Sequence, residues 1–490
     1  MLTRLKQFFS SRGGGAYLVG GYLRDSIVSL PAQDEVDIAM PGDPQSTGRD
    51  LAFALSGTYI PLGPAHGVAR VVAVADEGRR WTIDLKGYSG TIQEDLAQRD
   101  FTIDAMALPL ENWDPSITGI TEESIEDPFN GRQDLAGRRI RVVGAQVFRQ
   151  DPVRLLRAVR LAARMNFMLD PETARLVRAD SHRISQVSGE RVRDEFLALL
   201  RLDGARAHLE VLDRLDLLCR IIPELAVTKG VEQPKQHYWD VWGHSLHAVE
   251  NAELVTKGHQ NSPIYTQVPW KAETNEYFSQ EVSDGHTRRT ILKLAALFHD
   301  IAKPQTKKKD DTGRTRFLGH PELGATMAAA RLGQMRVSSR GIAMVSKMVE
   351  QHLRPMHMMQ GVDSPTRRAV FRYFRDVGDV AIDTLYLSLA DHLAAKGPEL
   401  STEEWIGHAR MVGRVLDAHD EAPTGDGSPA GPGKLVTGND LMEHFSLEPG
   451  PMIGSMLEKI DEARAAGEVT SKSEALAMAG AALRNLREEE

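Results

Sequence analysis

The chain contains 490 residues, of which 41% are hydrophobic and 26% are charged, and it carries a formal net charge of −9. This length exceeds what one hydrophobic core usually organises, so we expect two to four domains. The negative charge argues against a protein that coats nucleic acid non-specifically. A single cysteine, Cys219, excludes an internal disulfide and a zinc site built from cysteines. The sequence shows neither an apolar run long enough for a membrane helix nor a signal-peptide pattern, so we expect a cytoplasmic protein.

The first part of the chain, residues 16–110, has the pattern of mixed strands and helices. Short apolar runs bounded by Gly, Pro and Asp indicate strands, and these runs are AYLVGG, EVDIAM, GVARVVAVA and RWTIDLKGY. A helix from about Tyr22 to Ser29 is expected after the paired glycines. The pattern predicts an α/β or α+β domain and excludes a helical bundle here.

From about Asp151 onward the apolar spacing becomes helical. Pro152 after Asp151 marks a helix start, and helical segments continue toward the C-terminus. Residues 256–286 are polar and show little periodicity, so we expect an inserted loop. The stretch APTGDGSPAGPGK at 422–434 is typical of a linker, and a short helical tail follows it. The chain as a whole is therefore predicted to be α+β.

One window has a charge opposite to that of the whole chain. Residues 132–201 hold fifteen arginines, no lysine and eight acidic residues, which gives a net charge of +7, so the remainder is −16. Such a window suggests contacts with phosphates. A solvated helical surface would produce the same composition, and charge alone does not separate the two.

The first candidate site combines paired glycines with two carboxylates. Gly20 and Gly21 follow a strand, where a glycine backbone can approach a phosphate closely and the next helix start can bind it. Arg24 could add positive charge for a triphosphate. Glu35 and Asp37 lie two residues apart on a strand, so they share a face and could bind Mg²⁺ for phosphoryl or nucleotidyl transfer.

Four ordered motifs make residues 16–225 resemble the class II tRNA nucleotidyltransferase and poly(A) polymerase family. They are LVGGYLRD with EVDIA, RDFTIDAMAL, DPFNGRQDLAGRRIRVVG and FRQDPVRLLRAVRLAARMNF. The resemblance implies a polymerase-β-like head that holds metal carboxylates. It also implies a helical neck that selects the incoming nucleotide with protein side chains instead of a nucleic-acid template.

The resemblance assigns roles to individual residues. Glu35 and Asp37 take the metal positions, and Arg99 and Asp100 fall where the family contacts the nucleotide sugar and phosphates. Asp151 and Arg154 fall where the family pairs with the base edge. Arg157 and Arg160 on the following helix are candidates for contacts with the triphosphate or the RNA backbone. GERVRDE at 189–195 resembles the next family motif, with Glu190, Arg191 and Arg193 as candidate residues.

Asp84 is a candidate third carboxylate on a neighbouring strand, where it would accept the proton of the RNA 3′-hydroxyl. The alternative is an aspartate that caps a turn at a strand end. Three positions depart from the family pattern: Glu35 stands for the usual Asp, Asp104 for Asn, and Gln150 for Glu. These departures leave open whether the head is active.

The second candidate site is a set of histidines and aspartates. His244, His299, Asp300 and Asp391 occur in contexts such as FHDIAKP that resemble the HD phosphohydrolase superfamily over about 240–395. His320 and His352 resemble the extra ligands of its two-metal members, and Lys303 could contact a phosphate. Imidazole ligands favour Ni²⁺, Mn²⁺, Co²⁺ or Fe²⁺, whereas the carboxylate head favours Mg²⁺. The alternative is a degenerate domain that only helps to hold tRNA.

These features predict four domains. They are a nucleotidyltransferase head at 1–130, a helical neck at 131–225, an HD-type body at 226–420 and a helical tail at 435–490. We predict an enzyme that adds C, A or both from CTP and ATP to the tRNA 3′ end, with no membrane association and no stable protein partner. The alternatives are an HD phosphohydrolase or cyclic phosphodiesterase with an inactive head, a poly(A) polymerase, and an inactive RNA-binding protein. The motifs do not distinguish CCA, CC-only, A-only and poly(A) addition, and they do not give the oligomeric state.

Overall fold

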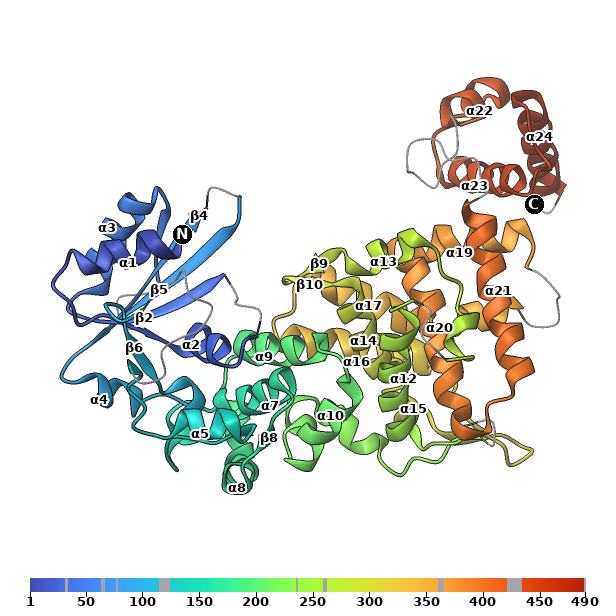
Figure 1. Ribbon diagram of the computed structural model, residues 1–490. Helices are drawn as coiled ribbons and strands as arrows, with labels where there is room; N and C mark the ends of the chain where they lie inside the picture. The colour runs from blue at the N-terminus through green and yellow to red at the C-terminus, as the bar shows by residue number, and fades with distance from the viewer. Residues whose placement is uncertain are drawn as a thin grey trace. The chain divides into compact units, whose positions relative to one another are not determined.

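The chain is described by a computed structural model, and it forms two compact units (Figure 1). One unit comprises residues 1–199 and 211–221, and the other comprises 200–210 and 222–490. The structure describes residues 1–30, 34–62, 67–75, 78–113, 124–234, 237–258, 262–359, 365–420 and 434–488. No helix within these ranges has both the length and the apolar character needed to cross a bilayer. The combination of a sheet-containing unit and a helical unit confirms the predicted α+β class.

The first unit contains a six-stranded sheet of order β3-β4-β5-β2-β1-β6. Its strands are β1 (Tyr17–Val19), β2 (Glu35–Pro41), β3 (Thr58–Pro61), β4 (Val68–Val74), β5 (Arg80–Tyr88) and β6 (Ala107–Pro109). Strand β2 runs parallel to β5, and the other neighbouring pairs are antiparallel. The four apolar runs of the sequence correspond to β1, β2, β4 and β5, whereas the short strands β3 and β6 carry no clear alternation.

Helices surround this sheet and continue beyond it. They are α1 (Leu2–Ser10), α2 (Gly20–Ile27), α3 (Pro44–Leu55), α4 (Ile92–Leu96), α5 (Gly131–Ala136), α6 (Val147–Gln150), α7 (Arg154–Met165), α8 (Pro171–Asp180), α9 (Gly189–Arg201), α10 (Ala205–Arg214) and α11 (Leu218–Ile221). Helix α2 begins directly at the paired glycines, two residues earlier than predicted. Helix α7 begins at Arg154, because Pro152 and Val153 form the turn that precedes it. The small strands β7 (Arg139–Ile140) and β8 (Met168–Leu169) pair in parallel.

The alternation of β2 determines where its carboxylates lie. Val36 and Ile38 are fully buried on one face of the strand. Successive side chains of a strand point to opposite faces, so Glu35 and Asp37 lie together on the other face. The strand therefore contributes to the core and presents two acidic groups at the same time.

The second unit is helical around one apolar helix. Its helices before the C-terminal tail are α12 (Val241–Val255), α13 (Ala272–Ser279), α14 (Arg288–Phe298), α15 (Lys303–Thr306), α16 (His320–Gln334), α17 (Ser339–Gln351), α18 (Arg354–Met359), α19 (Arg367–Val377), α20 (Ala381–Lys396) and α21 (Thr402–Asp420). Every residue of α14 except Arg289 is buried, and this helix packs against α12, α17 and α20. A helix that is buried on nearly all sides is expected at the centre of a large core.

The prediction of an inserted loop at 256–286 is wrong. This segment contains α13 and a hairpin of β9 (Glu281–Ser283) with β10 (His286–Thr287). Phe278 is fully buried and its ring contacts that of Tyr386, with centroids 4.7 Å apart. One deeply buried aromatic side chain anchors a mostly polar segment, and periodicity does not reveal such an anchor.

A separate core holds the C-terminal helices together. These are α22 (Gly438–Phe445), α23 (Pro451–Ala465) and α24 (Lys472–Glu488). Leu441, Ile453 and Ile460 are among the buried residues of this core. The helical tail is therefore present, whereas residues 422–433 of the predicted linker lie outside the described residues.

Candidate functional site

Strands β2 and β5 bring three carboxylates to one level of the sheet. Their parallel register pairs Asp37 with Asp84 and Glu35 with Thr82. Asp84 lies in the middle of β5, so it does not cap a turn at a strand end. The side chain of Glu35 is half exposed, whereas that of Asp84 is 16% exposed. Glu35, Asp37 and Asp84 thus form an acidic group that is open to solvent on one side.

The surroundings of Asp37 disfavour its ionised form. Burial raises its pKa to about 6; Arg99 opposes the rise, and the carboxylates of Glu35 and Asp84 add to it. Like charges close together disfavour ionisation of each other. A bound cation would remove this penalty, and oxygen ligands on a half-open face suit a hard ion such as Mg²⁺.

Gly20 is required by the position of Asp37. Its φ angle is +71°, and a Cβ atom there would lie 2.6 Å from Oδ2 of Asp37. Left-handed backbone is costly for other residues, and this distance is too short for any side chain. Gly21 has neither constraint, because the nearest atom to a Cβ would be Nη2 of Arg24 at 3.5 Å. The first glycine of the pair therefore brings the backbone against the carboxylate.

The sequence gives no signal for Arg70, which joins this acidic group from β4. Its Nε and Nη2 each lie 2.7 Å from an oxygen of Asp84, and Nη2 lies 3.6 Å from Glu35. The antiparallel register places Arg70 directly opposite Asp84. Only the pairing of β4 with β5 reveals this contact. Arg70 holds the carboxylate plane of Asp84 through a bidentate bond.

Arg24, predicted to face a triphosphate, is instead buried among carboxylates. Its side chain is 3% exposed, Nη1 lies 2.6 Å from Asp104, and Nη2 lies 2.8 Å from Asp25. Arg164 of α7 also pairs with Asp25. These bonds tie α2 to the segment around Asp104 and to α7. They give Asp104 an ionic partner at the position where the family has an asparagine. A direct contact between Arg24 and a phosphate stays a prediction.

Arg99 and Asp100 also have partners within the unit. Arg99 pairs with Asp95 at 3.2 Å and donates to the backbone oxygen of Asp104. One oxygen of Asp100 accepts from Arg157 at 2.9 Å. Asp100 thus contacts α7 through Arg157, and the contacts of Arg99 and Asp100 with a nucleotide stay predictions.

Asp151 and Arg154, the predicted base-reading pair, lie at the start of α7. Arg154 donates to the backbone oxygen of Gln98 at 3.0 Å and approaches Gln150 at 3.5 Å, while its Nε is buried without a partner among the described residues. Both oxygens of Asp151 accept from Arg191, at 3.0 and 2.7 Å. Partial burial would raise the pKa of Asp151, but Arg191 outweighs it and the pKa is lowered. Asp151 is therefore a fixed, ionised acceptor, and Arg154 keeps donor capacity.

Arg157 and Arg160 converge on Glu195 of α9, a residue that the sequence did not single out. Arg157 lies 3.1 Å from one oxygen of Glu195 and Arg160 lies 2.5 Å from the other. Arg193 pairs with its neighbour Asp194. The spacing of three residues puts the two arginines on one face of α7. Part of the positive charge of the arginine-rich segment 132–201 is thus used in internal ion pairs.

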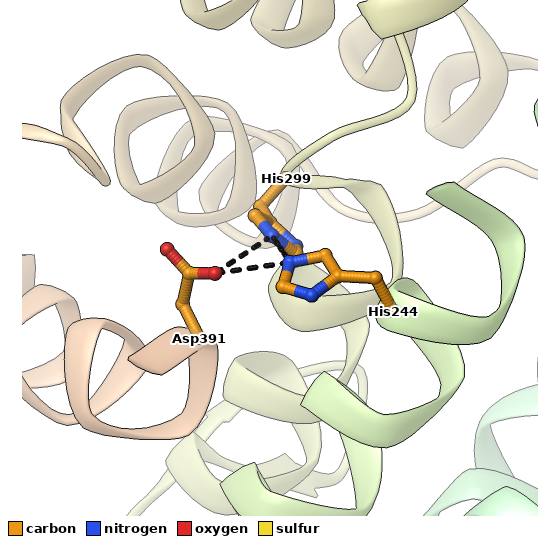
Figure 2. A group of neighbouring side chains, drawn as sticks. All are labelled: His244, His299 and Asp391. Atoms are coloured by element: carbon orange, nitrogen blue, oxygen red, sulfur yellow. Dashed lines mark hydrogen bonds and ion pairs between the residues drawn. The ribbon is translucent and has the colours of Figure 1, made fainter. Parts of the chain in front are cut away.

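The six histidines and aspartates that the sequence predicts as metal ligands converge in the second unit. His244 comes from α12, Asp391 comes from α20, and His299 directly follows α14; Figure 2 shows their side chains pointing toward one another. Nε2 of His244 lies 3.0 Å from Nε2 of His299 and 3.0 Å from Oδ1 of Asp391. These three residues form one possible metal group among the described residues.

A second group contains Asp300, whose side chain also lies near the histidines of the first group. Asp300, His320 and His352 offer ligand atoms within 4.8 Å of one another. Oδ1 of Asp300 lies 3.4 Å from Nε2 of His320, while its Oδ2 lies 3.3 Å from Nε2 of His244. The two oxygens of one buried carboxylate thus face two sets of histidines. A bridging carboxylate of this kind fits two metal ions side by side.

The ring orientations support ligation through Nε2. Nδ1 of His299, His320 and His352 each lies 2.6 to 2.8 Å from a backbone carbonyl oxygen. A carbonyl only accepts, so Nδ1 carries the proton and Nε2 is left to bind a metal. Burial and the neighbouring His299 lower the pKa of His352 to about 3, which keeps its imidazole neutral. The residues therefore fit a metal centre, in contrast to the more open head carboxylates, which do not converge as closely among the described residues.

Lys303 lies at the edge of this cluster. Its Nζ is 2.6 Å from Oδ2 of Asp300 and donates to Gln233 at 2.6 Å. The predicted phosphate contact would require Lys303 to share its three donors among these groups. The adjacent His-Asp pair itself lies just beyond the end of α14, where the chain turns, and not inside the helix.

Family models match most of the chain in order. A poly(A) polymerase head domain matches residues 16–141, an RNA- and SrmB-binding site of polymerase A matches 166–228, an HD domain matches 241–396, and tRNA nucleotidyltransferase domain 2 matches 434–479. The matched segments follow one another along the chain in the order polymerase head, RNA-binding region, HD domain and tRNA nucleotidyltransferase domain 2.

Named relatives and solved structures agree with these matches. A structure of the Thermotoga maritima CCA-adding enzyme with tRNA covers 98% of this chain and 95% of its own, with a TM-score of 0.59 and 20% identity, which indicates the same fold. The CC-adding tRNA nucleotidyltransferase of Thermus thermophilus is 31% identical over 94% of this chain and 92% of its own. The A-adding tRNA nucleotidyltransferase of Deinococcus radiodurans is 33% identical over 94% of both chains. The chain therefore belongs to the tRNA nucleotidyltransferase family and carries an HD domain.

Proposed function

We propose that this protein is a template-independent nucleotidyltransferase that adds C, A or both from CTP and ATP to the 3′ end of tRNA. The observation that carries the proposal is the cluster of three carboxylates, Glu35, Asp37 and Asp84, on two parallel strands. Gly20 brings the backbone close to this cluster. The names of the relatives, A-adding and CC-adding, indicate the same substrate and nucleotides. The three residues that depart from the family pattern each have a bonding partner in the structure, and this supports the proposal that the head is active.

Each residue group has a distinct part in the proposed reaction. Mg²⁺ bound by Glu35 and Asp37 would neutralise developing charge on the triphosphate. Asp84, held in place by Arg70, accepts the proton of the attacking 3′-hydroxyl. The amides at the start of α2, after Gly20, can donate to phosphate oxygens.

Base selection falls to the pair at the start of α7. Asp151 accepts hydrogen bonds only, and Arg154 donates only. C and A both present an exocyclic amine to the acceptor and ring or carbonyl acceptors to the donor, whereas U and G do not match this order. Arg191 fixes the acceptor, so the protein itself supplies the template.

The test is extension of tRNA that ends before, within or after the terminal CCA, with sequencing of the products. We expect Asp37→Ala to abolish addition without loss of fold. Asp34→Ala is the matched control, because Asp34 pairs with Arg79 and precedes β2. Wild-type extension by Asp37→Ala would contradict the metal assignment. The product sequence separates CCA, CC-only, A-only and poly(A) addition.

The histidine cluster favours a second function, metal-dependent hydrolysis of phosphoesters. The mixed imidazole and carboxylate set suits Ni²⁺, Mn²⁺, Co²⁺ or Fe²⁺ over Mg²⁺. His299→Ala with Asp300→Ala should remove tight metal binding and hydrolysis of 2′,3′-cyclic or simple phosphoesters but should leave extension of tRNA intact. The control is the same double change at His419 and Asp420, an adjacent His-Asp pair at the exposed end of α21.

Two results would count against this division of labour. If metal analysis of wild-type protein reloaded with each ion finds no tight site, the HD domain is a structural relic. If the folded double variant also loses extension, the HD domain serves the nucleotidyl transfer directly.

The order of the matched segments supports the domain limits 1–130, 131–225, 226–420 and 435–490, which we propose for the head, neck, HD body and tail. We also propose that the protein acts in the cytoplasm without a stable protein partner. Fractionation of cells, followed by size-exclusion chromatography of the native protein, tests both statements.

A further inference from the structure

A basic hairpin of the second unit lies next to the histidine cluster. Strands β11 (Lys308–Lys309) and β12 (Thr315–Arg316) form it. Residues 303–316 contain six lysines and arginines but only two aspartates, in a chain whose net charge is −9. The exposed cations of the hairpin are Lys307, Lys308, Lys309, Arg314 and Arg316. The local charge is therefore opposite to that of the whole protein.

Both ends of the hairpin are fixed to metal-ligand residues. Before it, Nζ of Lys303 lies 2.6 Å from Oδ2 of Asp300. After it, the backbone oxygen of Phe317 lies 2.7 Å from Nδ1 of His320. Nζ of Lys303 also lies over the Phe317 ring, 5.5 Å from its centroid. The hairpin thus starts and ends at the edge of the cluster.

The turn of the hairpin is held in one conformation by Asp310. Its carboxylate accepts from the backbone amides of Thr312 and Arg314, each at 3.0 Å, and from Nε of Arg316 at 3.0 Å. Gly313 supplies the left-handed residue of the turn, with φ of +78°. The charge of Asp310 is therefore used inside the turn, and the hairpin does not need a ligand to form.

Among the described residues, the remaining positive charges of the hairpin have no acidic partner. Lys308 lies directly opposite Arg316 in the strand register, and like charges at facing positions destabilise a strand pair. Within the described parts of the chain, no ion pair involves Lys307, Lys308, Lys309 or Arg314. A bound polyanion would offset this repulsion. The arrangement costs folding stability and is suited to binding.

We propose that the 307–316 hairpin binds the phosphate backbone of RNA and leads an RNA phosphoester to the histidine cluster. A row of cations on a narrow, preformed hairpin suits a string of phosphates. The segment 307–316 has no apolar side chain to insert into a membrane. The choice of RNA rests on the proposed phosphohydrolase function, because the cluster at Asp300 is suited to phosphoester hydrolysis.

The test compares two full-length variants with the same change in net charge. Lys308→Glu with Lys309→Glu alters the hairpin, whereas Arg410→Glu with Lys459→Glu alters exposed positions on α21 and α23. Binding of a short single-stranded RNA is measured over a range of salt concentrations. The hairpin variant should lower the slope of log affinity against log salt by roughly 1.4, about 0.7 for each of two phosphate contacts. The control should keep the wild-type slope.

A second measurement addresses hydrolysis. The metal-loaded hairpin variant should cleave an RNA with a 2′,3′-cyclic phosphate end about tenfold more slowly than the control, which corresponds to about 1.4 kcal/mol. If wild type cleaves no phosphoester, the phosphohydrolase function fails, and the salt slope alone decides whether the hairpin binds RNA. Equal slopes for the two variants would overturn the proposal. Hairpin-dependent binding to vesicles of anionic lipid, without an effect on RNA, would also overturn it.

Discussion

Replacing Gly20 by alanine tests whether the backbone at the start of α2 is shaped around the catalytic carboxylate. The added Cβ would lie 2.6 Å from Oδ2 of Asp37, and φ at this position is +71°. Two separate penalties therefore act on one methyl group: one on the backbone and one on the position of Asp37.

The size of each penalty follows from the geometry. Left-handed backbone costs a residue with a Cβ atom about 1–2 kcal/mol. Contact distances near 3.5 Å require the carboxylate of Asp37 to move by roughly 1 Å, and misplacement of a reacting group by this much costs about 100-fold in rate. We expect Gly20→Ala to lower the free energy of unfolding by about 1–2 kcal/mol and nucleotide addition by about 100-fold.

Chemical denaturation and single-turnover extension of tRNA measure the two effects. Gly21→Ala is the stability control, because φ there is ordinary and the nearest side-chain atom is 3.5 Å away; it should unfold no more easily than wild type. Adding Asp37→Ala to Gly20→Ala removes the steric conflict, so the combined loss of stability should be smaller than the sum of the two single losses.

Two outcomes would refute the reasoning. If Gly20→Ala unfolds like wild type, neither the backbone conformation nor the close approach to Asp37 is correct. If the variant is destabilised but extends tRNA at the wild-type rate, Asp37 does not lie at the reacting centre.

Three further changes probe other parts of the molecule. Arg154→Ala should relax selection of C and A or cripple incorporation, by roughly 10- to 100-fold, and unchanged rates for all four nucleotides would rule out its role as template. Arg288→Ala leaves the fully buried Asp383 without its 2.8 Å ionic partner, so the free energy of unfolding by denaturant should fall by about 3–5 kcal/mol. Adding Asp383→Asn should restore part of this loss. A loss below 1 kcal/mol would mean that the pair is not buried as described. Burial opposes ionisation of Glu253, but Lys293 and hydrogen bonds outweigh it and lower its pKa from 4.5 to about 2. The stability that ionised Glu253 contributes is therefore complete above pH 4.5 and is lost as pH falls toward 2. Glu253→Gln should flatten the acid limb of a plot of unfolding free energy against pH, and an unchanged limb would contradict this role of Glu253.

The sequence predicts those parts of the fold and site that depend on local pattern. Strand alternation is enough to place Glu35 and Asp37 on one face, because Val36 and Ile38 must enter the core. Ordered motifs are enough to predict the head, the neck and the HD domain, and the family matches confirm the recognition.

The parts that the sequence does not predict depend on pairing between distant segments. Arg70 meets Asp84 only because β4 lies beside β5 in one register. Glu195 meets Arg157 and Arg160 only because α9 lies against α7. The shared position of Asp300 between two sets of histidines likewise depends on how separate helices pack. Local periodicity carries no information on such contacts.

The path of the chain limits how the two units can be separated. The boundaries at 199/200, 210/211 and 221/222 fall inside α9, inside α10 and at the end of α11. A fragment that stops at residue 199 lacks 211–221 of its own unit. A fragment that starts at residue 222 lacks Gly204 and Ala205, whose amides donate to Glu253. No single truncation yields either unit complete, so gene dissection would damage both, and the two proposed activities are better separated by point substitutions in the intact chain.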